Sequence, residues 1–304
     1  MTILPPSPGE PRRPFGARDT GDAWVEAPTG EKYWGRYGAA GLLAYDADRG
    51  ILMQHRVFWS HFGGTWALPG GARHEEESAT EGALREAEEE ADVPDRAIRP
   101  RLASVLDLGF WSYTTIVGDV VVPFEPKIGD WESTDLAWVP LDEVSERPLH
   151  PGFRDSWERL RALLPVRPTV IVDAANVVGS VPDGWWRDRA GAAARLIERL
   201  AELGERGIPA AALDLPEHTW FPRIVAVLEG QAKDAAPDAP HGVEIARAAG
   251  HGDDEIVAQA RAAAQAGETV TVVTSDRELG ERVQSVGGIV RGTRWLLDQF
   301  GDER

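Results

Sequence analysis

Cysteine is absent from the 304 residues, so the chain can form neither disulfides nor thiolate-based metal or catalytic sites. This absence is typical of a cytoplasmic protein, and we expect that location. No stretch approaches the ~20 consecutive apolar residues that a membrane-spanning helix needs, so no membrane partner is expected. Prolines stand where a signal peptide would have its apolar segment, and we therefore expect residues 1–22 to be a disordered tail.

Basic residues are scarce, and lysine especially so. The chain has 32 Lys and Arg against 50 Asp and Glu, a formal net charge of −18. Proteins that bind nucleic acid broadly present a basic face, so this balance argues against such binding, whereas it suits divalent cations. Apolar residues make up 42% of the chain, which is enough for a sizeable core, and the length favours two domains.

The stretch from Gly70 to Val93 carries the strongest pattern in the sequence. Ser78 followed three residues later by Glu81 is a capping box, which predicts a helix beginning near Ala79. Small and apolar residues then recur at helical spacing and would pack against a sheet. They are Ala83, Leu84, Ala87 and Ala91.

Beside this apolar stripe, Glu86, Glu89 and Glu90 fall at i, i+3 and i+4, which places their carboxylates on one face of the helix. Half-burying three like charges is costly, and a divalent cation with oxygen ligands would relieve that cost. Arg85 can hold Glu77 or Glu81 and so fix the loop that precedes the helix. A solvated acidic helix is the simpler explanation of the glutamates alone, but it does not account for the spaced Gly71, Glu77 and Arg85.

This spacing resembles the Nudix box, Gly-x5-Glu-x7-Arg-Glu-U-x-Glu-Glu-x-Gly-U with U apolar, and departs from it only at Asp92, where the pattern has glycine. The resemblance implies a Nudix hydrolase domain, an α/β/α sandwich with a mixed sheet, over residues 23–165. It also implies an NTP pyrophosphohydrolase-like activity, dependent on Mg²⁺ or Mn²⁺, that cleaves the diphosphate linkage of a nucleoside diphosphate derivative. The implied metal site comprises Gly71, Glu86, Glu89 and Glu90, and the implied catalytic residues are Glu77, Arg85, Glu86 and Glu132.

Two assignments around the box remain open at the level of sequence. A further carboxylate is expected in the loop before the strand at 136–141, where Glu132 is favoured over Glu125 and Asp130. The general base is then either Glu86 or Glu132. Upstream of the box, a segment rich in histidine and aromatic residues is expected near the site. It offers His55, Arg56 and His61 as substrate contacts, although each could equally be an ordinary loop residue.

The remaining strands and helices of this half follow from local pattern. Strands are expected near 38–45, 51–54, 102–108, 111–117, 119–124 and 136–141, with a closing helix over 157–164. From residue 166 onward, strand patterns at 169–172, 210–213, 224–228, 243–245 and 270–273 alternate with helical ones, including a long helix over 187–206. Such alternation predicts a second α/β domain over 166–304 with a mostly parallel sheet.

Acidic residues follow several of these later strands, and the carboxyl ends of parallel strands meet at one edge of a sheet. Asp173 ends the first strand, Asp253 and Asp254 open a helix, and Asp276 opens another. Asn176 lies one turn beyond Asp173. Each aspartate alone is best explained as a helix cap, but together they could bind one or two divalent metals.

This second constellation resembles the NYN branch of the PIN-like nucleases, with Glu229 standing where that family often has Asp-Gly. The resemblance implies an RNA-directed nuclease at Asp173, Asn176, Asp253, Asp254 and Asp276. The alternative is a catalytically inert nucleotide- or RNA-binding module, which the acidic balance of the chain also fits. The partners expected overall are a nucleotide-type small molecule and, at this second half, RNA.

Overall fold

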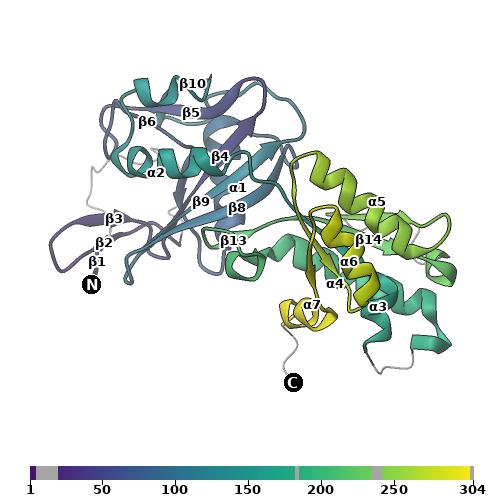
Figure 1. The fold of residues 1–304 in the computed structure, drawn as a ribbon. Helices are drawn as coiled ribbons and strands as arrows, with labels where there is room; N and C mark the ends of the chain where they lie inside the picture. Colours follow the sequence, from purple (N-terminus) through teal and green to yellow (C-terminus); the bar gives the residue numbers. More distant parts are fainter. Residues whose placement is uncertain (5–19, 182–184, 235–241, 302–304) are drawn as a thin grey trace. The chain divides into compact units, whose positions relative to one another are not determined.

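The computed structural model describes residues 1–4, 20–181, 185–234 and 242–301 (Figure 1). The chain forms two compact units, Met1–Leu164 and Pro165–Arg304, each with its own sheet and helices. In the described ranges no helix combines the length and the apolar character that crossing a membrane requires.

The first unit is built around strand β4 (Ala39–Asp46), whose first six residues are buried. β4 pairs in parallel with β9 (Ser112–Val120) and antiparallel with β5 (Gly50–Arg56) and β7 (Gly70–Ala72). β10 (Ser133–Val139) pairs with β5, β8 (Ile98–Asp107) pairs with β9, and the two-residue β6 (Trp66–Ala67) pairs with β5. The mixed sheet expected from the sequence is therefore present.

Helix α1 (Ala79–Ala91) packs against this sheet and begins where the capping box predicts. Ser78 accepts the backbone N–H of Glu81, and the Glu81 side chain accepts the N–H of Ser78. Three of its alanines are fully buried, which lets the helix lie close to β4 and β7. A second helix, α2 (Pro151–Leu163), buries Trp157, and the short η1 (Val144–Glu146) precedes it.

The first residues are ordered where a tail was expected. β1 (Thr2–Leu4), β2 (Trp24–Glu26) and β3 (Lys32–Trp34) form a three-stranded antiparallel sheet, so the prediction of disorder is wrong for residues 2–4. Backbone pairing with β2 supplies the order that the local composition did not indicate. Residues 5–19 of the expected tail lie outside the described residues.

The second unit contains a five-stranded sheet in the order β15-β14-β11-β16-β17, with every pairing parallel. All six residues of β11 (Pro168–Asp173) are buried, as expected for a central strand covered on both faces. Its neighbours are β14 (Arg223–Leu228), β15 (Val243–Arg247), β16 (Thr269–Val273) and β17 (Ile289–Arg291).

Helices α5 (Gly252–Gln265) and α6 (Arg277–Ser285) share one apolar core with this sheet, which includes Ile171, Val227 and Ile256. The long helix α4 (Arg189–Arg206) packs against β14 and β15. The other elements of the unit are short. They are α3 (Ala174–Gly179), α7 (Thr293–Gln299), β12 (Ile208–Pro209), β13 (Thr219–Trp220), η2 (Trp185–Arg187), η3 (Ala210–Leu213) and η4 (Gly230–Asp234).

Two strand predictions are wrong. Residues 210–213 form the 3₁₀ helix η3, because the apolar run fills the core through a turn and ends at Asp214 in the left-handed region. Residues 111–117 and 119–124 are not two strands, since β9 continues through Gly118 to Val120 and then ends. Gly118 lies under the Ile98 side chain and is accommodated within the strand, so the glycine does not mark a turn.

Candidate functional site

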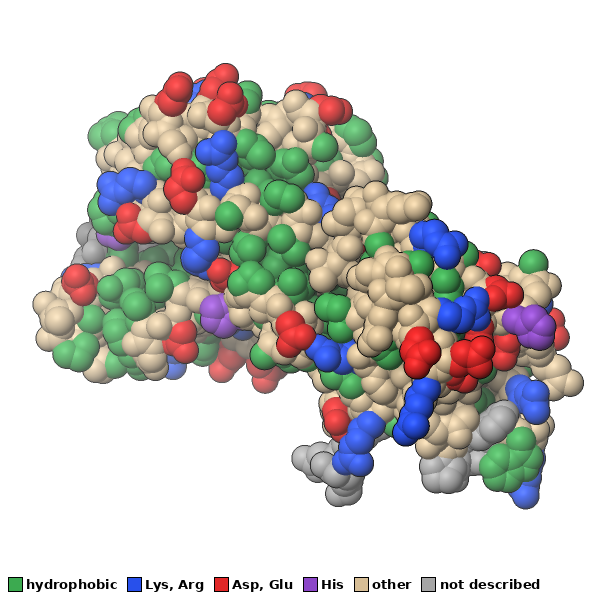
Figure 2. All heavy atoms as spheres, in the orientation of Figure 1, with side chains coloured by type: hydrophobic (Ala, Val, Ile, Leu, Met, Phe, Trp, Pro, Cys, Tyr) green, Lys and Arg blue, Asp and Glu red, His purple; other side chains and the backbone are tan. Residues whose placement is uncertain are grey.

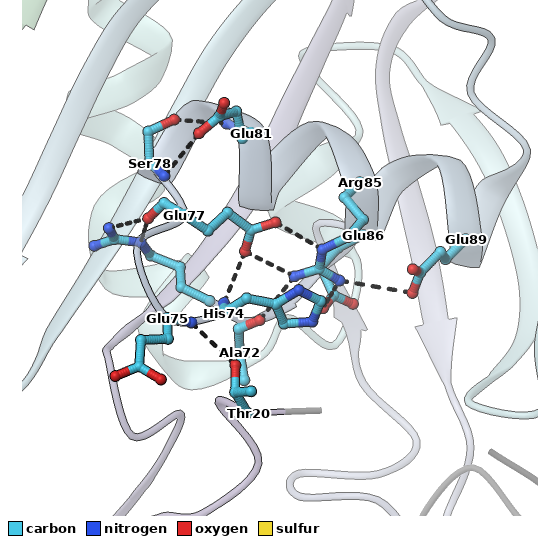
Figure 3. A network of polar contacts seen from close by, with 11 residues as sticks. Thr20, Ala72, His74, Glu75, Glu77, Ser78, Glu81, Arg85, Glu86 and Glu89 are labelled. Carbon is cyan, nitrogen blue, oxygen red and sulfur yellow. Dashed lines mark hydrogen bonds and ion pairs between the residues drawn. The ribbon is translucent and has the colours of Figure 1, made fainter. Parts of the chain in front are cut away.

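Arg85 on α1 organises the loop before the helix (Figure 3). Its guanidinium donates to both carboxylate oxygens of Glu77, at 2.8 and 3.0 Å, to Glu86 at 2.7 Å and to the Ala72 carbonyl at 2.9 Å. Burial raises the pKa of Glu77, but the bonds from Arg85 and from the His74 N–H outweigh it and hold the pKa below its usual value. Of the two partners predicted for Arg85, the structure selects Glu77, while Glu81 caps the helix.

Glu86 is buried, with 8% of its surface exposed, and its carboxyl group lies over Gly71. A Cβ atom at position 71 would lie 2.6 Å from the Glu86 carboxyl carbon. The glycine that opens the box therefore leaves the space that this carboxylate occupies. The structure thus joins Gly71, Arg85 and Glu86, three of the residues predicted from the sequence, in one arrangement.

Glu90 is the most buried carboxylate of α1, with 3% of its surface exposed. One of its oxygens accepts the backbone N–H of Gly70 at 2.7 Å and the side-chain N–H of Gln54 at 3.2 Å. Ser133 in turn donates to the Gln54 side-chain oxygen at 2.6 Å. β5, β7 and β10 thereby hold the end of this carboxylate in a fixed position.

Asp130 and Glu132 approach Glu90 from the loop before β10. One oxygen from each of the three carboxylates lies within 4.8 Å of the other two. Burial, together with the charges of Glu86, Asp130 and Glu132, raises the pKa of Glu90 well above its usual value. Both Glu132 and its rival Asp130 therefore reach the site, whereas Glu125 is 85% exposed and pairs with Arg49.

These residues fit a divalent cation. Asp130 and Glu132 raise the affinity of Glu90 for a proton, and the three carboxylates together present the hard oxygen ligands that Mg²⁺ and Mn²⁺ prefer. Glu89 differs from the others, because it is 34% exposed and lies 3.7 Å from Arg85. Sequence reasoning placed it beside Glu86 and Glu90 with equal weight, since helical spacing alone does not distinguish their burial.

The basic residues upstream of the box have different neighbours: Arg56 contacts His61, whereas His55 contacts Thr134 and Trp66. Arg56 ends β5, and its Nε donates to the His61 carbonyl at 3.2 Å. His61 lies in the loop between β5 and β6, with its ring 6.4 Å from that of His150, a residue not predicted from the sequence. His55, one residue before Arg56, instead bonds Thr134 at 2.6 Å and packs against Trp66.

In the second unit, acidic side chains lie at the carboxyl ends of the parallel strands. Asp173 caps α3 by accepting the Asn176 N–H at 3.0 Å, and its other oxygen accepts the Thr274 hydroxyl at 2.9 Å. Asn176 accepts the Ser275 N–H at 2.9 Å, which joins the ends of β11 and β16. Asp276 caps α6 by accepting the Leu279 N–H at 3.0 Å.

The charges of this second cluster act on one another. Burial raises the pKa of Asp173, with Asp253 and Glu229 adding to the effect. Burial and the charge of Asp276 raise the pKa of Asp253. Glu229 also accepts the Gly252 N–H at 2.8 Å and so belongs to the cluster despite departing from the expected motif. Among the described residues, however, only the Glu90 trio brings three such ligand atoms within 4.8 Å.

Asp254, next to Asp253 in the chain, pairs with Arg282. Both line a pocket with Glu229, His251 and Gly252. On the face drawn in Figure 2, acidic side chains of this unit gather beside basic ones. Of the two aspartates that the sequence left as alternatives, Asp253 is therefore the one coupled to Asp173 and Asp276.

Comparison with known proteins identifies the first unit. Residues 35–160 match the NUDIX domain family. The putative 8-oxo-dGTP diphosphatase 3 of Mycobacterium tuberculosis is 45% identical over 154 residues, which make up 47% of this chain and 70% of that protein. A nucleoside triphosphate pyrophosphatase/Nudix hydrolase fusion protein of Bifidobacterium longum is 41% identical over 155 residues, 47% of this chain and 32% of that protein.

Among solved structures, the Nudix hydrolase RenU from M. smegmatis is 44% identical, with a TM-score of 0.43. The match covers 47% of this chain and 94% of that one. The family match and the relative from M. tuberculosis establish the class: this chain belongs to the Nudix family. It is a hydrolase of the kind that acts on phosphoanhydride bonds.

Proposed function

We propose that the first unit cleaves the diphosphate linkage of a nucleoside diphosphate derivative with the help of Mg²⁺ or Mn²⁺. The observation that carries this proposal is the trio of Glu90, Asp130 and Glu132, in which buried Glu90 is fixed by Gln54 and the Gly70 N–H and the other two carboxylates are partly buried. Carboxylates this close to a buried one repel it, and the energy of the group falls when a cation is shared among them. A bound divalent cation would offset phosphate charge and lower the pKa of a water molecule.

Glu90, Asp130 and Glu132 would hold the cation, and Glu86, whose charge also acts on Glu90, would border it. Arg85 orients the Glu86 carboxylate through the bond at 2.7 Å. Gly71 leaves room for that carboxylate, so the position of Glu86 is set before any substrate arrives. Either Glu86 or Glu132 would then accept the proton of the attacking water.

Matched substitutions separate these two candidates for the base. Glu86→Gln and Glu132→Gln should be compared for turnover and for the stabilisation that Mn²⁺ gives against thermal unfolding. Loss of the base lowers kcat by about 10²-fold or more and leaves metal stabilisation intact, whereas loss of a ligand lowers both. If neither variant lowers kcat, the proton is taken up elsewhere and this part of the proposal is wrong.

The names of the relatives narrow the substrates that merit testing. One relative is described as a putative 8-oxo-dGTP diphosphatase and another as a nucleoside triphosphate pyrophosphatase/Nudix hydrolase fusion protein. We therefore propose a nucleoside triphosphate as the substrate, with dGTP and 8-oxo-dGTP as the first pair to compare. The assay measures release of pyrophosphate against release of phosphate, which also reports which linkage is cleaved.

For the second unit we propose a metal-dependent ribonuclease of the NYN/PIN-like kind, with an inert binding module as the alternative. The charge of Asp253 adds to the raised pKa of Asp173 and the charge of Asp276 adds to that of Asp253, which favours a metal site over independent helix caps. Thr274 and Asn176 orient this cluster from adjacent strand ends. Cleavage of a single-stranded RNA with Mn²⁺ tests the activity, and metal binding without cleavage supports the alternative.

We further propose that the two units are separate domains. Each has its own sheet, and the boundary between them lies between Leu164 and Pro165. Fragments divided at that point should each unfold cooperatively on heating. A fragment that does not fold alone would mean that its core depends on the other unit.

A further inference from the structure

Arg56 lies beside the acidic trio of the first unit, and His61 and His150 lie close enough for its charge to act on both. Arg56 comes from the end of β5, His61 from the following loop and His150 from the residue that caps α2. In the described part of the chain, no ion pair joins any of them to Asp or Glu.

The three groups are held in place by contacts that do not use up their binding capacity. The Arg56 backbone carbonyl accepts the Gly64 N–H at 2.9 Å, and its Nε donates to the His61 carbonyl at 3.2 Å. These bonds fold the β5–β6 loop over Arg56 and leave the two terminal guanidinium nitrogens without a partner among the described residues. Phe62 packs between the imidazoles, with its ring 4.2 Å from His61 and 4.8 Å from His150.

His150 is fixed by bonds at both ends. Its backbone N–H donates to the Trp66 carbonyl at 2.8 Å, and its Nδ1 accepts the Gly152 N–H at 3.2 Å. Because Nδ1 is an acceptor, the proton of the neutral ring is on Nε2, which can donate. Positive charge at the N-terminus of the 13-residue α2 adds to the attraction for an anion at this point.

The charge of Arg56 acts both on the acidic trio and on the two imidazoles. It opposes the rise in the pKa of Glu90, which places Arg56 beside the acidic trio. Burial, followed by Arg56, lowers the pKa of His61, while burial, Arg56 and His61 lower that of His150 to about 4. Both imidazoles are therefore neutral at neutral pH in the free protein, and an anion between them and Arg56 would favour their protonation.

We propose that Arg56, His61 and His150 form an anion-binding patch that holds phosphoryl oxygens of the nucleotide substrate next to the acidic trio. This inference rests on the proposed function for the kind of anion. Compared with the substrate contacts expected from the sequence, it adds His150 and leaves out His55. Strand alternation explains the omission, because Gln54 and Arg56 share the face of β5 toward Glu90 and His55 lies on the other. The patch takes up protons as the anion binds, so its charge follows that of the ligand.

The probe is inorganic pyrophosphate added to the 304-residue chain in EDTA, with the imidazole C2 protons followed by NMR across a pH titration. The resonance that is lost from the spectrum of His61→Asn is that of His61, and the one lost from the spectrum of His150→Asn is that of His150. Asn at position 150 can still cap α2, so the helix is kept while the titrating ring is removed. His218, which lies in the second unit, provides an internal reference whose signal should not respond.

Pyrophosphate should shift the titration midpoints of both imidazoles to higher pH, and Arg56→Gln should weaken its binding roughly tenfold or more. Unchanged midpoints, absence of binding, or equal binding by Arg56→Gln would each overturn the patch. Nucleotide hydrolysis with Mg²⁺ is measured separately. Hydrolysis without an imidazole response refutes the patch alone, whereas an imidazole response without hydrolysis of any nucleotide refutes only the proposed function.

Discussion

Arg85 and Glu77 form a two-point ion pair in which Nε and Nη2 of the guanidinium donate to the two carboxylate oxygens at 2.8 and 3.0 Å. Glu77 precedes α1, so this pair joins the helix to the loop that leads into it. The third nitrogen of the same guanidinium holds Glu86 at 2.7 Å. One planar side chain thus sets the shape of the loop and the direction of a carboxylate in the proposed site.

Arg85→Lys keeps the charge but cannot reproduce this fork. Each bond to an ionised partner contributes roughly 1.5–3 kcal/mol, and the side chain is only 19% exposed, so solvent screens the pair weakly. We expect the variant to lose at least about 2 kcal/mol in urea unfolding and to turn over more slowly. Arg154→Lys, at a 63% exposed position, is the matched control and should change neither quantity. Equal stability of both variants would contradict this role for Arg85.

Asp92 occupies the position where the Nudix pattern has glycine, and the structure explains both residues. It ends α1 in the left-handed region, with φ of 54°, and its carboxylate pairs with the exposed Lys127. Asp92→Gly should be at least as stable as the wild type, and Asp92→Ala should be about 1 kcal/mol less stable than Asp92→Gly. Thermal unfolding of the three proteins checks the order. Greater stability of the alanine variant would exclude backbone strain as the reason for glycine in the pattern.

The raised pKa of Glu90 predicts how stability depends on pH without metal. The folded chain holds this proton more tightly than the unfolded chain, so the contribution is complete below the ordinary value of 4.5 and is lost as pH rises through the raised value. In EDTA, Glu90→Gln should therefore gain stability over the wild type as pH rises to neutral. With Mn²⁺ present, the wild type should instead be the more stable of the two proteins at neutral pH. Urea unfolding of both proteins at acid and neutral pH measures it, and a pH-independent difference would show that the carboxylate is not crowded.

The second unit offers adjacent aspartates as a matched pair. Asp253 is coupled to Asp276 and Glu229, whereas Asp254 pairs with Arg282. In a Glu90→Gln background, Mn²⁺ should raise the melting temperature of the full chain, and Asp253→Asn should reduce that gain. Asp254→Asn should leave it in place. If Asp253→Asn keeps the Mn²⁺-induced gain in melting temperature, or if the Glu90→Gln protein shows no such gain, the metal site is excluded and the aspartates act only as helix caps.

The local part of the first site could be predicted from sequence, because the box lies within one loop and one helix. Ser78 and Glu81 define the start of α1, and helical spacing brings Glu86 and Glu90 to one side. Burial is decided by partners from distant strands, so the sequence could not rank Glu90 above Glu89. The role of Gln54, which bonds Glu90 across 36 positions, follows only from the sheet pairing.

The same limit applies to residues that the sequence reading missed. His150 stands before a proline at a helix start, a local signal for a cap and not for a site. Thr274 follows β16, and only the parallel pairing of β16 with β11 brings it to Asp173. Residues 210–213 were predicted as a strand because an apolar run of four is compatible with either a strand or a turn that fills the core. Tertiary pairing decides such cases.

The rate of Mg²⁺-dependent nucleoside triphosphate hydrolysis in wild type, Glu90→Gln and Glu88→Gln tests the central claim most directly. Both substitutions remove one charge from α1, but Glu88 is exposed and Glu90 lies in the acidic trio. The account predicts that Glu90→Gln lowers turnover by about 10²-fold or more while Glu88→Gln retains the wild-type rate. Turnover by Glu90→Gln at the wild-type rate, on a substrate that the wild type cleaves, would contradict it.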